Sequence, residues 1–271
     1  MIWQLPDEPV VAVPTASVEA SPANLRGLVS LIDLTTLEST DTPDKVRALC
    51  ARALEPGPGL PSCAAVCVYP AMVPAAAAAL RGTAVPVAAV AGGFPSGQLP
   101  AELKAAEAAW AVEHGAGEID LVINRGLFLT GDYAAVEDEV AGVRRAIGAT
   151  PLKVILETGE LPGPAHWRLA ADIALAAGAD VVKTSTGKCA VGATPEAAGV
   201  LCEAAAAATA TTGTPRGFKA AGGVRTPAQA LAYQAIVATR LGREAATDPH
   251  RFRIGASSLL DGIVAALAAA R

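Results

Sequence analysis

The chain is apolar, poor in aromatic residues and acidic, and each property excludes a class of protein. Among 271 residues, 52% are hydrophobic and 4% aromatic, and 26 acidic against 21 basic residues give a formal charge of −5. The most apolar region is interrupted by Arg81, Gly82 and Pro86, so we expect no membrane span. Because the basic residues are scattered, neither nucleic acid nor an anionic membrane is expected as a partner.

The N-terminus and the cysteines indicate a reducing compartment. The first ten residues, MIWQLPDEPV, carry Asp7 and Glu8 and lack a basic region before an apolar segment, so we expect no secretory signal and a cytoplasmic location. The five cysteines stand at unrelated spacings, which predicts neither a disulfide framework nor a zinc site. We expect them to be small buried side chains.

Eight short segments rich in β-branched residues follow one another at fairly even intervals. They are LVSLIDLT from Leu28, AAVCVYP from Ala64, VPVAAVAG from Val85, EIDLVIN from Glu118, LKVILETG from Leu152, DVVKTST from Asp180, RGFKAAG from Arg216 and RFRIGASS from Arg251. Most are continuous apolar runs rather than strict alternations. Such runs are typical of strands covered on both faces, as in a parallel sheet wrapped by helices.

Stretches with helix start and stop signals lie between these segments. Thr42, Thr194 and Thr226 each precede a proline, the pattern of a hydroxyl N-cap before proline at the first helical position, and Pro100 begins a further stretch. Glycines stand where these helices should end, at Gly115, Gly148, Gly178 and Gly242.

Strand and helix therefore alternate eight times, after an amphipathic piece near residues 17–27. This order predicts an α/β fold, a (β/α)8 TIM barrel with a short N-terminal helical extension. We expect residues 1–27 to form the extension and residues 28–271 a single catalytic barrel domain. A doubly wound open sheet is the alternative, but the glycine fingerprint that usually follows its first strand is absent.

Few polar residues interrupt the strands near their carboxyl ends, where barrels of this kind carry their active sites. They are Asp33, Asp120, Glu157, Lys183 and Lys219. Lys183 would project into a poorly hydrated interior, where a charge is costly unless it is paired or neutralised. It is either half of a structural ion pair or a nucleophilic amine, whose pKa would be lowered by burial and by Lys219 on the neighbouring strand.

The three acids have structural and functional interpretations side by side. Asp120 is a salt-bridge partner for either lysine, a proton carrier acting through water, or both. Asp33 either holds a lysine in place or only fills a polar layer, and Glu157 is more readily explained as structural.

Glycine and serine gather where the last two strands end, at the place where barrels usually bind phosphate. Gly222 and Gly223 follow one strand, and Gly255, Ser257 and Ser258 end the other. They predict a phosphate site, against the alternative that they only cap helices. A hydroxyl and a cation, Thr186 and Lys188, are expected at the same rim.

None of the three histidines stands at the carboxyl end of a strand. His114 ends a predicted helix, His166 lies at a helix start, and His250 precedes the last strand. A metal-dependent aldolase or hydrolase would need ligands in the mouth of the barrel, so this class is disfavoured. We expect no metal and no other cofactor.

Seven motifs together resemble the deoxyribose-phosphate aldolase family. In chain order, from about Leu31 to Leu260, they are LIDLTTL, AVCVYP, EIDLVIN, LKVILETGEL, VVKTSTGK, GFKAAGGVRT and RIGASS. The resemblance implies a (β/α)8 barrel and a class I aldolase, a carbon–carbon lyase of deoxyribose catabolism. Such an enzyme reversibly cleaves 2-deoxy-D-ribose 5-phosphate to D-glyceraldehyde 3-phosphate and acetaldehyde through a lysine Schiff base, without metal.

The resemblance also implies roles for single residues. Lys183 would form the Schiff base, Lys219 would lower its pKa, and Asp120 would transfer protons with water. Asp33 would support the lysine pair, and Cys67 would lie near the substrate. Contacts to substrate or phosphate are implied for Thr35, Thr186, Lys188, Gly222, Gly223, Gly255, Ser257 and Ser258.

One feature departs from the family pattern. Some members end in a tyrosine that assists proton exchange at acetaldehyde, whereas this chain ends in LAAAR, so another group or water would take that role. Residues 1–27 are either a flexible extension or part of a contact in a homodimer. The remaining alternatives are a Schiff-base aldolase acting on a ketose phosphate and a barrel retained for binding alone.

Overall fold

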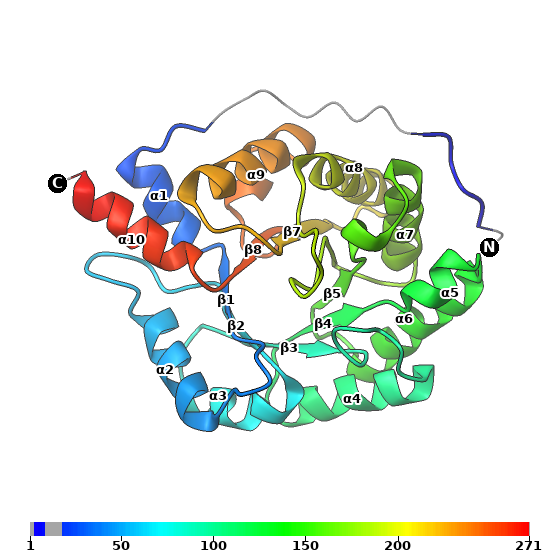
Figure 1. Cartoon of the computed structure of the whole chain (residues 1–271), viewed down its shortest axis with the longest axis horizontal. Helices are drawn as coiled ribbons and strands as arrows, with labels where there is room; N and C mark the ends of the chain where they lie inside the picture. The colour runs from blue at the N-terminus through cyan, green and yellow to red at the C-terminus, as the bar shows by residue number, and fades with distance from the viewer. Residues whose placement is uncertain (1–2, 9–17, 271) are drawn as a thin grey trace.

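In the computed structural model, which describes residues 3–8 and 18–270, eight parallel strands close into a barrel in chain order, and β1 pairs with β8 (Figure 1). The strands are β1 (Ile32–Thr35), β2 (Ala65–Val68), β3 (Val87–Ala91), β4 (Glu118–Val122), β5 (Leu152–Ile155), β6 (Val181–Lys183), β7 (Gly217–Ala221) and β8 (Phe252–Ala256). The predicted TIM barrel is confirmed. The open-sheet alternative is wrong, because its edge strands would stay unpaired.

Helices surround the barrel and cover the outer faces of its strands (Figure 1). The α-helices are α1 (Pro22–Val29), α2 (Pro43–Leu54), α3 (Val73–Ala79), α4 (Ala101–Glu113), α5 (Arg125–Leu129), α6 (Tyr133–Ile147), α7 (Pro164–Ala176), α8 (Pro195–Thr212), α9 (Pro227–Arg240) and α10 (Leu259–Ala269). Short 3₁₀ turns are η1 (Pro70–Met72), η2 (Thr158–Glu160) and η3 (Ala245–Thr247). None of the helices in the described part of the chain has the length and apolarity needed to cross a bilayer.

The predicted helix signals operate as local chemistry requires. The hydroxyls of Thr42, Thr194 and Thr226 accept hydrogen bonds from backbone amides in the first turns of α2, α8 and α9. The four predicted stop glycines all have positive φ, a conformation that other residues adopt at a cost. These ends set the lengths of the helices that return the chain to the next strand.

The first strand is shorter than predicted. Leu28 and Val29, expected as its start, are instead the last residues of α1, and β1 begins at Ile32. The reason is local: the Ser21 hydroxyl caps the helix, Pro22 opens it, and the apolar residues at its end are buried in the core. Residues 1–2 and 9–17 of the predicted extension lie outside the described residues.

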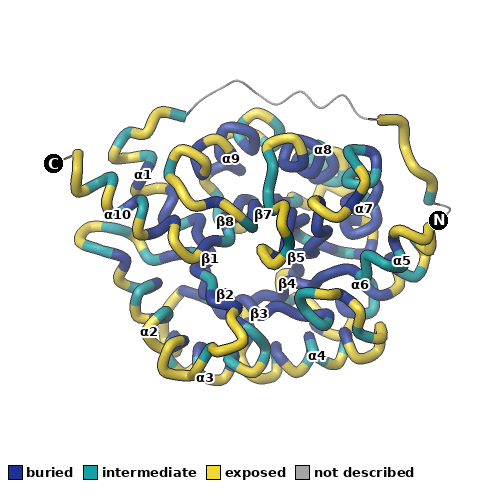
Figure 2. The backbone as a smooth tube through the Cα atoms, in the orientation of Figure 1, coloured by how far each residue is buried: buried dark blue, intermediate teal, exposed yellow. Residues whose placement is uncertain are grey.

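The strands at the centre of the molecule are buried, and the surrounding helices are exposed along their outer faces (Figure 2). The main core lies between the strands and the helices, and the alanine tracts of α3 and α8 contribute small side chains to it. A second, smaller apolar cluster lies inside the barrel beside β2 and β3. The rest of the interior is charged, which is where the candidate site begins.

Candidate active site

Seven ionisable side chains from six strands lie inside the barrel, each at most 5% exposed. They are Asp33, Glu118, Asp120, Lys153, Lys183, Lys219 and Arg253. Strand register brings them together, since Asp120 is paired with Lys153 across β4 and β5, and Lys183 with Lys219 across β6 and β7. We call this set the interior charge cluster.

Asp120 lies at the centre of the interior charge cluster. Its Oδ2 accepts hydrogen bonds from the ammonium groups of Lys183 and Lys219, both at 2.7 Å, and its Oδ1 accepts one from Lys153 at 2.8 Å. One carboxylate therefore holds three lysines from three consecutive strands. The predicted lysine pair and its acid are adjacent in space.

The remaining acids hold the cations from the other side. Asp33 accepts hydrogen bonds from Lys219 and Arg253. Glu118 pairs with Lys153 at 2.6 Å and with both terminal nitrogens of Arg253. Asp33 thus contacts one lysine of the predicted pair, Lys219, whereas Glu118, Lys153 and Arg253 complete the cluster without having been predicted.

The two central lysines differ in their affinity for a proton. Burial, and then the positive charge of Lys219, lower the pKa of Lys183 below its ordinary value, although Asp120 acts against them. Burial acts to lower the pKa of Lys219 too, but Asp120 and Asp33 outweigh it and raise that pKa. Lys219 therefore stays a cation, while Lys183 is the lysine that can supply a free amine.

The two aspartates remain ionised despite complete burial. Burial alone would raise the pKa of Asp120, but Lys153, Lys183 and Lys219 hold it well below the usual range. The same opposition lowers the pKa of Asp33, with Arg253 as the largest favourable partner. Asp120 is consequently an anion at neutral pH, and both of its oxygens act as hydrogen-bond acceptors.

Cys67 belongs to the apolar side of the interior. It packs with Ala65, Ala88 and Val90 in the second apolar cluster and is 1% exposed. Burial raises the pKa of its thiol, so it is not a nucleophile at neutral pH. Cys67 does not line the cavity described next.

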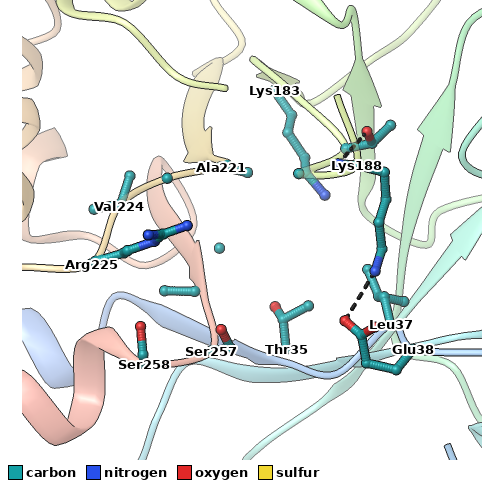
Figure 3. Close-up of a pocket in the computed structure, with 16 residues that line it drawn as sticks. Thr35, Leu37, Glu38, Lys183, Lys188, Ala221, Val224, Arg225, Ser257 and Ser258 are labelled. Atoms are coloured by element: carbon teal, nitrogen blue, oxygen red, sulfur yellow. Dashed lines mark hydrogen bonds and ion pairs between the residues drawn. The ribbon is translucent and has the colours of Figure 1, made fainter. Parts of the chain in front are cut away.

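A cavity of about 190 Å³ opens above the interior charge cluster (Figure 3). Its lining residues come from the carboxyl ends of β1, β6, β7 and β8 and from the loops after them: Thr35, Leu37, Glu38, Lys183, Thr186, Gly187, Lys188, Ala221, Gly222, Gly223, Val224, Arg225, Gly255, Ala256, Ser257 and Ser258. Figure 3 shows the Lys183 side chain reaching into this space from β6. Within the interior charge cluster, Lys183 is thus the member that lines the cavity.

Opposite Lys183 the cavity wall is formed by small residues and one cation. Gly222 and Gly223 follow β7 with positive φ. Ser257 and Ser258, which Figure 3 labels, stand before the first turn of α10. Arg225 lines the same cavity as the two serines and is exposed. Backbone amides at a helix start, hydroxyls and a guanidinium together can bind a phosphate.

The rim carries an ion pair that crosses the mouth. Lys188, in the loop after β6, pairs with Glu38, in the loop after β1, at 3.0 Å (Figure 3). Both line the cavity and both are partly open to solvent. A pair this exposed contributes little to stability, so Lys188 can exchange Glu38 for an anionic group of a ligand.

Glu157 orders the loop that carries Lys188. Its backbone is left-handed, with φ of 56°, and its buried carboxylate accepts from the Thr186 amide at 3.2 Å and from the Thr186 hydroxyl. The Thr186 hydroxyl oxygen in turn accepts from the Lys188 amide at 3.1 Å. These bonds fit the structural interpretation of Glu157.

Replacing Glu157 with glutamine should destabilise the protein by about 1–3 kcal/mol, because the amide NH₂ group takes the place of one carboxylate oxygen and faces the Thr186 N–H in a buried site. A thermal or denaturant unfolding curve measures the change. Glu160→Gln in the same turn is the matched control, since its carboxylate is partly exposed and pairs with Arg125 at the surface. That control should cost less than about 1 kcal/mol, and equal losses in both variants would contradict the assignment.

The predicted residues thus separate into two layers. Lys183 and the predicted substrate contacts Thr35, Thr186, Lys188, Gly222, Gly223, Gly255, Ser257 and Ser258 line the cavity. Asp33, Cys67, Asp120 and Lys219 are buried in the interior and do not line it. Missed were Arg225 and Glu38 at the cavity, and Lys153, Glu118 and Arg253 in the interior. The last three could have been found from the sequence, because each is a charged residue at an inward position of an apolar strand. The search for polar residues should therefore cover whole strands and not only their carboxyl ends.

Within residues 3–8 and 18–270, no group of three or more histidine, cysteine, aspartate and glutamate side chains is arranged to hold a metal ion. The five cysteines are free thiols, four of them buried and Cys189 partly exposed.

Comparison with known proteins gives consistent matches along the chain. The sequence model of the DeoC/LacD family aldolases matches residues 28–263. A deoxyribose-phosphate aldolase of Homo sapiens is 43% identical over 270 residues, 94% of this chain and 84% of that protein. One of Agrobacterium fabrum is 43% identical over 89% of this chain and 90% of its own length. The solved deoxyribose phosphate aldolase of Aeropyrum pernix, described as tetrameric, superposes with a TM-score of 0.67 at 28% identity, covering 93% of this chain and 98% of that one.

Proposed function

Since this chain belongs to the DeoC/LacD family of aldolases, we propose that it is a class I aldolase that reversibly cleaves 2-deoxy-D-ribose 5-phosphate to D-glyceraldehyde 3-phosphate and acetaldehyde. One observation carries the proposal: Lys183, with a lowered pKa, projects from a charged interior into a cavity whose far wall is suited to phosphate. The reaction proposed here uses a lysine Schiff base and no metal or organic cofactor.

The proposed chemistry begins with the free amine of Lys183. The amine adds to C1 of the open-chain aldose to give a carbinolamine, and loss of water leaves a protonated imine. The imine withdraws electrons as the C2–C3 bond breaks, the C3 hydroxyl gives up its proton as C3 becomes the new aldehyde carbon, and glyceraldehyde 3-phosphate leaves. The remaining enamine takes a proton at carbon, and water hydrolyses the resulting imine to acetaldehyde and the amine.

The charged interior supports this sequence in two ways. Asp120, which contacts both central lysines, is the group we propose to move protons through water during loss of the carbinolamine hydroxyl and protonation of the enamine. Lys219 is proposed to remain protonated throughout and to disfavour a second positive charge on Lys183. We assign proton exchange at acetaldehyde to Asp120 and water, because Asp120 contacts the amine that would carry the enamine.

We place the substrate phosphate at Gly223, Ser257 and Ser258, with Arg225 beside it. This position anchors one end of an open-chain sugar while its aldehyde reaches Lys183 at the other side of the cavity (Figure 3). Holding the sugar at both ends orients C1 toward the amine, an effect that contributes several kcal/mol toward the barrier in oriented reactions.

Substituting Arg225 with methionine should raise KM for 2-deoxyribose 5-phosphate about tenfold, because a charge-assisted hydrogen bond contributes about 1.5–3 kcal/mol. The value of kcat should change much less. Unphosphorylated 2-deoxyribose is the matched control, since its kcat/KM should be the same in the variant and the parent. Steady-state kinetics with both sugars measure the effect, and equal losses for the two sugars would place the phosphate elsewhere.

Borohydride reduction in the presence of acetaldehyde tests the proposed function. The reduced imine leaves an ethyl group on Lys183, which blocks tryptic cleavage there and keeps peptide 169–188 intact. Exposed Lys45 serves as the internal control for nonspecific alkylation, and Lys183 should be saturated well before it. No adduct, or one on Lys188 or Lys219 instead, would overturn the mechanism.

Three further assignments belong to the same proposal. We propose residues 28–271 as the catalytic unit, a cytoplasmic location, and a homodimer as the smallest assembly. Leu103 and Trp110 on α4 are 50% and 39% exposed and offer an apolar contact, and the Aeropyrum pernix relative is described as tetrameric. Light scattering on the purified chain would decide the assembly.

A further inference from the structure

The interior charge cluster holds more cations than carboxylates. Lys153, Lys183, Lys219 and Arg253 stand against Asp33, Glu118 and Asp120, all buried. On the remaining strands that face this space, β2 and β3, the interior residues are Cys67, Ala65, Ala88 and Val90, which add no charge at neutral pH. If every lysine were protonated, the interior would therefore keep one unbalanced positive charge.

The cations share the carboxylates unequally. Lys153 bonds Glu118 and Asp120 and lies 3.8 Å from Asp33, Lys219 bonds Asp33 and Asp120, and Arg253 bonds Asp33 and Glu118. Lys183 bonds Asp120 alone, through the oxygen that Lys219 also uses. Losing a proton from Lys183 therefore removes the surplus charge at the smallest loss of ion pairing.

Glu118 and Arg253 lie deeper in the barrel than the reacting groups. Glu118 precedes Asp120 by two residues on β4, and Arg253 precedes Gly255 by two on β8, so each points inward one layer below. Neither lines the cavity, and both are at most 5% exposed. They cannot touch a substrate, and any effect on the reaction must act through the lysines.

We propose that Glu118 and Arg253 are positioning residues that set the net charge of the barrel interior. Because of that charge, Lys183 is the one cation of the cluster whose proton exceeds what the buried carboxylates balance. The proposal rests on Lys183 being the Schiff-base lysine. Arg253 cannot lose its own proton, so it always contributes one charge, and Glu118 together with the two aspartates cancels three of the four. The free amine of Lys183 is then a consequence of the whole cluster and not of Lys219 alone.

Single substitutions of Glu118 and Arg253 should shift the pH at which Lys183 becomes reactive, in opposite directions. Arg253→Met leaves equal numbers of cations and carboxylates, which favours protonated Lys183. Glu118→Gln adds to the surplus and favours the free amine. The rate of borohydride trapping at Lys183, measured against pH, should shift its midpoint upward by about one pH unit in the first variant and downward by about one in the second.

Two further variants guard against a simple structural defect. The double variant E118Q/R253M restores the original surplus, so its midpoint should return to that of the parent even where its stability does not. Lys153→Met removes one cation by another route and should shift the midpoint upward like Arg253→Met, which keeps the test available should Arg253→Met fail to fold. A general loss of packing would lower the trapping rate without opposite shifts.

The outcomes separate this inference from the proposed function. A parent adduct on Lys183 with opposite shifts and a restored double variant would support both. A parent adduct on Lys183 with unmoved midpoints in variants that fold would overturn the role of Glu118 and Arg253 and leave the aldolase proposal intact. Absence of an adduct on Lys183 in the parent would overturn both.

Discussion

Replacing Lys219 with leucine should lower kcat/KM for 2-deoxyribose 5-phosphate about 10³-fold at pH 7.5. Without the neighbouring ammonium, Lys183 no longer shares the Oδ2 of Asp120 with a second cation, and its pKa rises toward the ordinary value of 10.5. Only about one molecule in 10³ would then carry the free amine at that pH. KM should remain measurable, because the proposed phosphate contacts lie outside the substituted side chain.

The rate of the Lys219→Leu variant should depend on pH, and the direction of that dependence tests the explanation. The amine of Lys183 is reactive only when unprotonated, so the rate of the Lys219→Leu variant should increase about tenfold per pH unit and approach that of the parent near pH 10. Initial rates between pH 6 and 10 measure it. Unchanged turnover in the variant would show that the charge of Lys219 does not activate Lys183.

Lys104 provides a matched control for removing a buried ammonium. Its side chain is fully buried on α4, where it pairs with Glu139 at 2.8 Å, and it does not line the cavity. Lys104→Met makes the same chemical change and should reduce stability, since it leaves Glu139 buried without its cation. The kcat of the folded enzyme should be that of the parent, which separates activation from folding.

Replacing Asp120 with asparagine should lower kcat by about 10²–10⁴-fold and destabilise the protein by about 3–5 kcal/mol. The amide cannot neutralise Lys153, Lys183 and Lys219, and its NH₂ group faces ammonium donors. Two losses are combined: a counterion for buried cations and the group proposed to move protons. Steady-state kinetics and denaturant unfolding measure them separately.

The two variants should differ in their response to pH. Loss of Asp120 removes the group that raises the pKa of Lys183, so the amine stays free and alkaline pH should not restore turnover as it does in Lys219→Leu. Because the pKa of Asp120 is depressed in the folded state, its stabilisation is fully present above about pH 4 and is lost as pH falls further. The stability difference between parent and variant should therefore narrow in acid. Recovery of Asp120→Asn activity at high pH would argue that Asp120 only tunes Lys183.

Much of the fold could be predicted from short stretches of sequence. Continuous apolar runs, threonine–proline helix starts and stop glycines each depend on a few neighbouring residues, and the eightfold alternation of strand and helix leaves few architectures. The strand start misplaced at Leu28 arose because an apolar pair can complete a helix as readily as it can begin a strand.

The candidate site was predictable where a residue conflicts with its local surroundings. Lys183, Lys219 and Asp120 are charges within apolar strands, a conflict visible in the sequence itself. Arg225 shows the limit, because an arginine in a polar loop conflicts with nothing nearby. Only the approach of the loop after β7 to the start of α10 places it at the same cavity as Ser257 and Ser258.

By itself, the sequence determined that charged groups enter an apolar barrel, which strands carry them, and that the lysines lie on neighbouring strands. The tertiary structure decided how those charges are shared: Arg253 reaches back to Asp33 because β8 pairs with β1, and Glu118 joins the two ends of the cluster. The physical reason is that a pKa in a dry interior depends on every charge within a few ångströms. Those distances exist only after the barrel has closed.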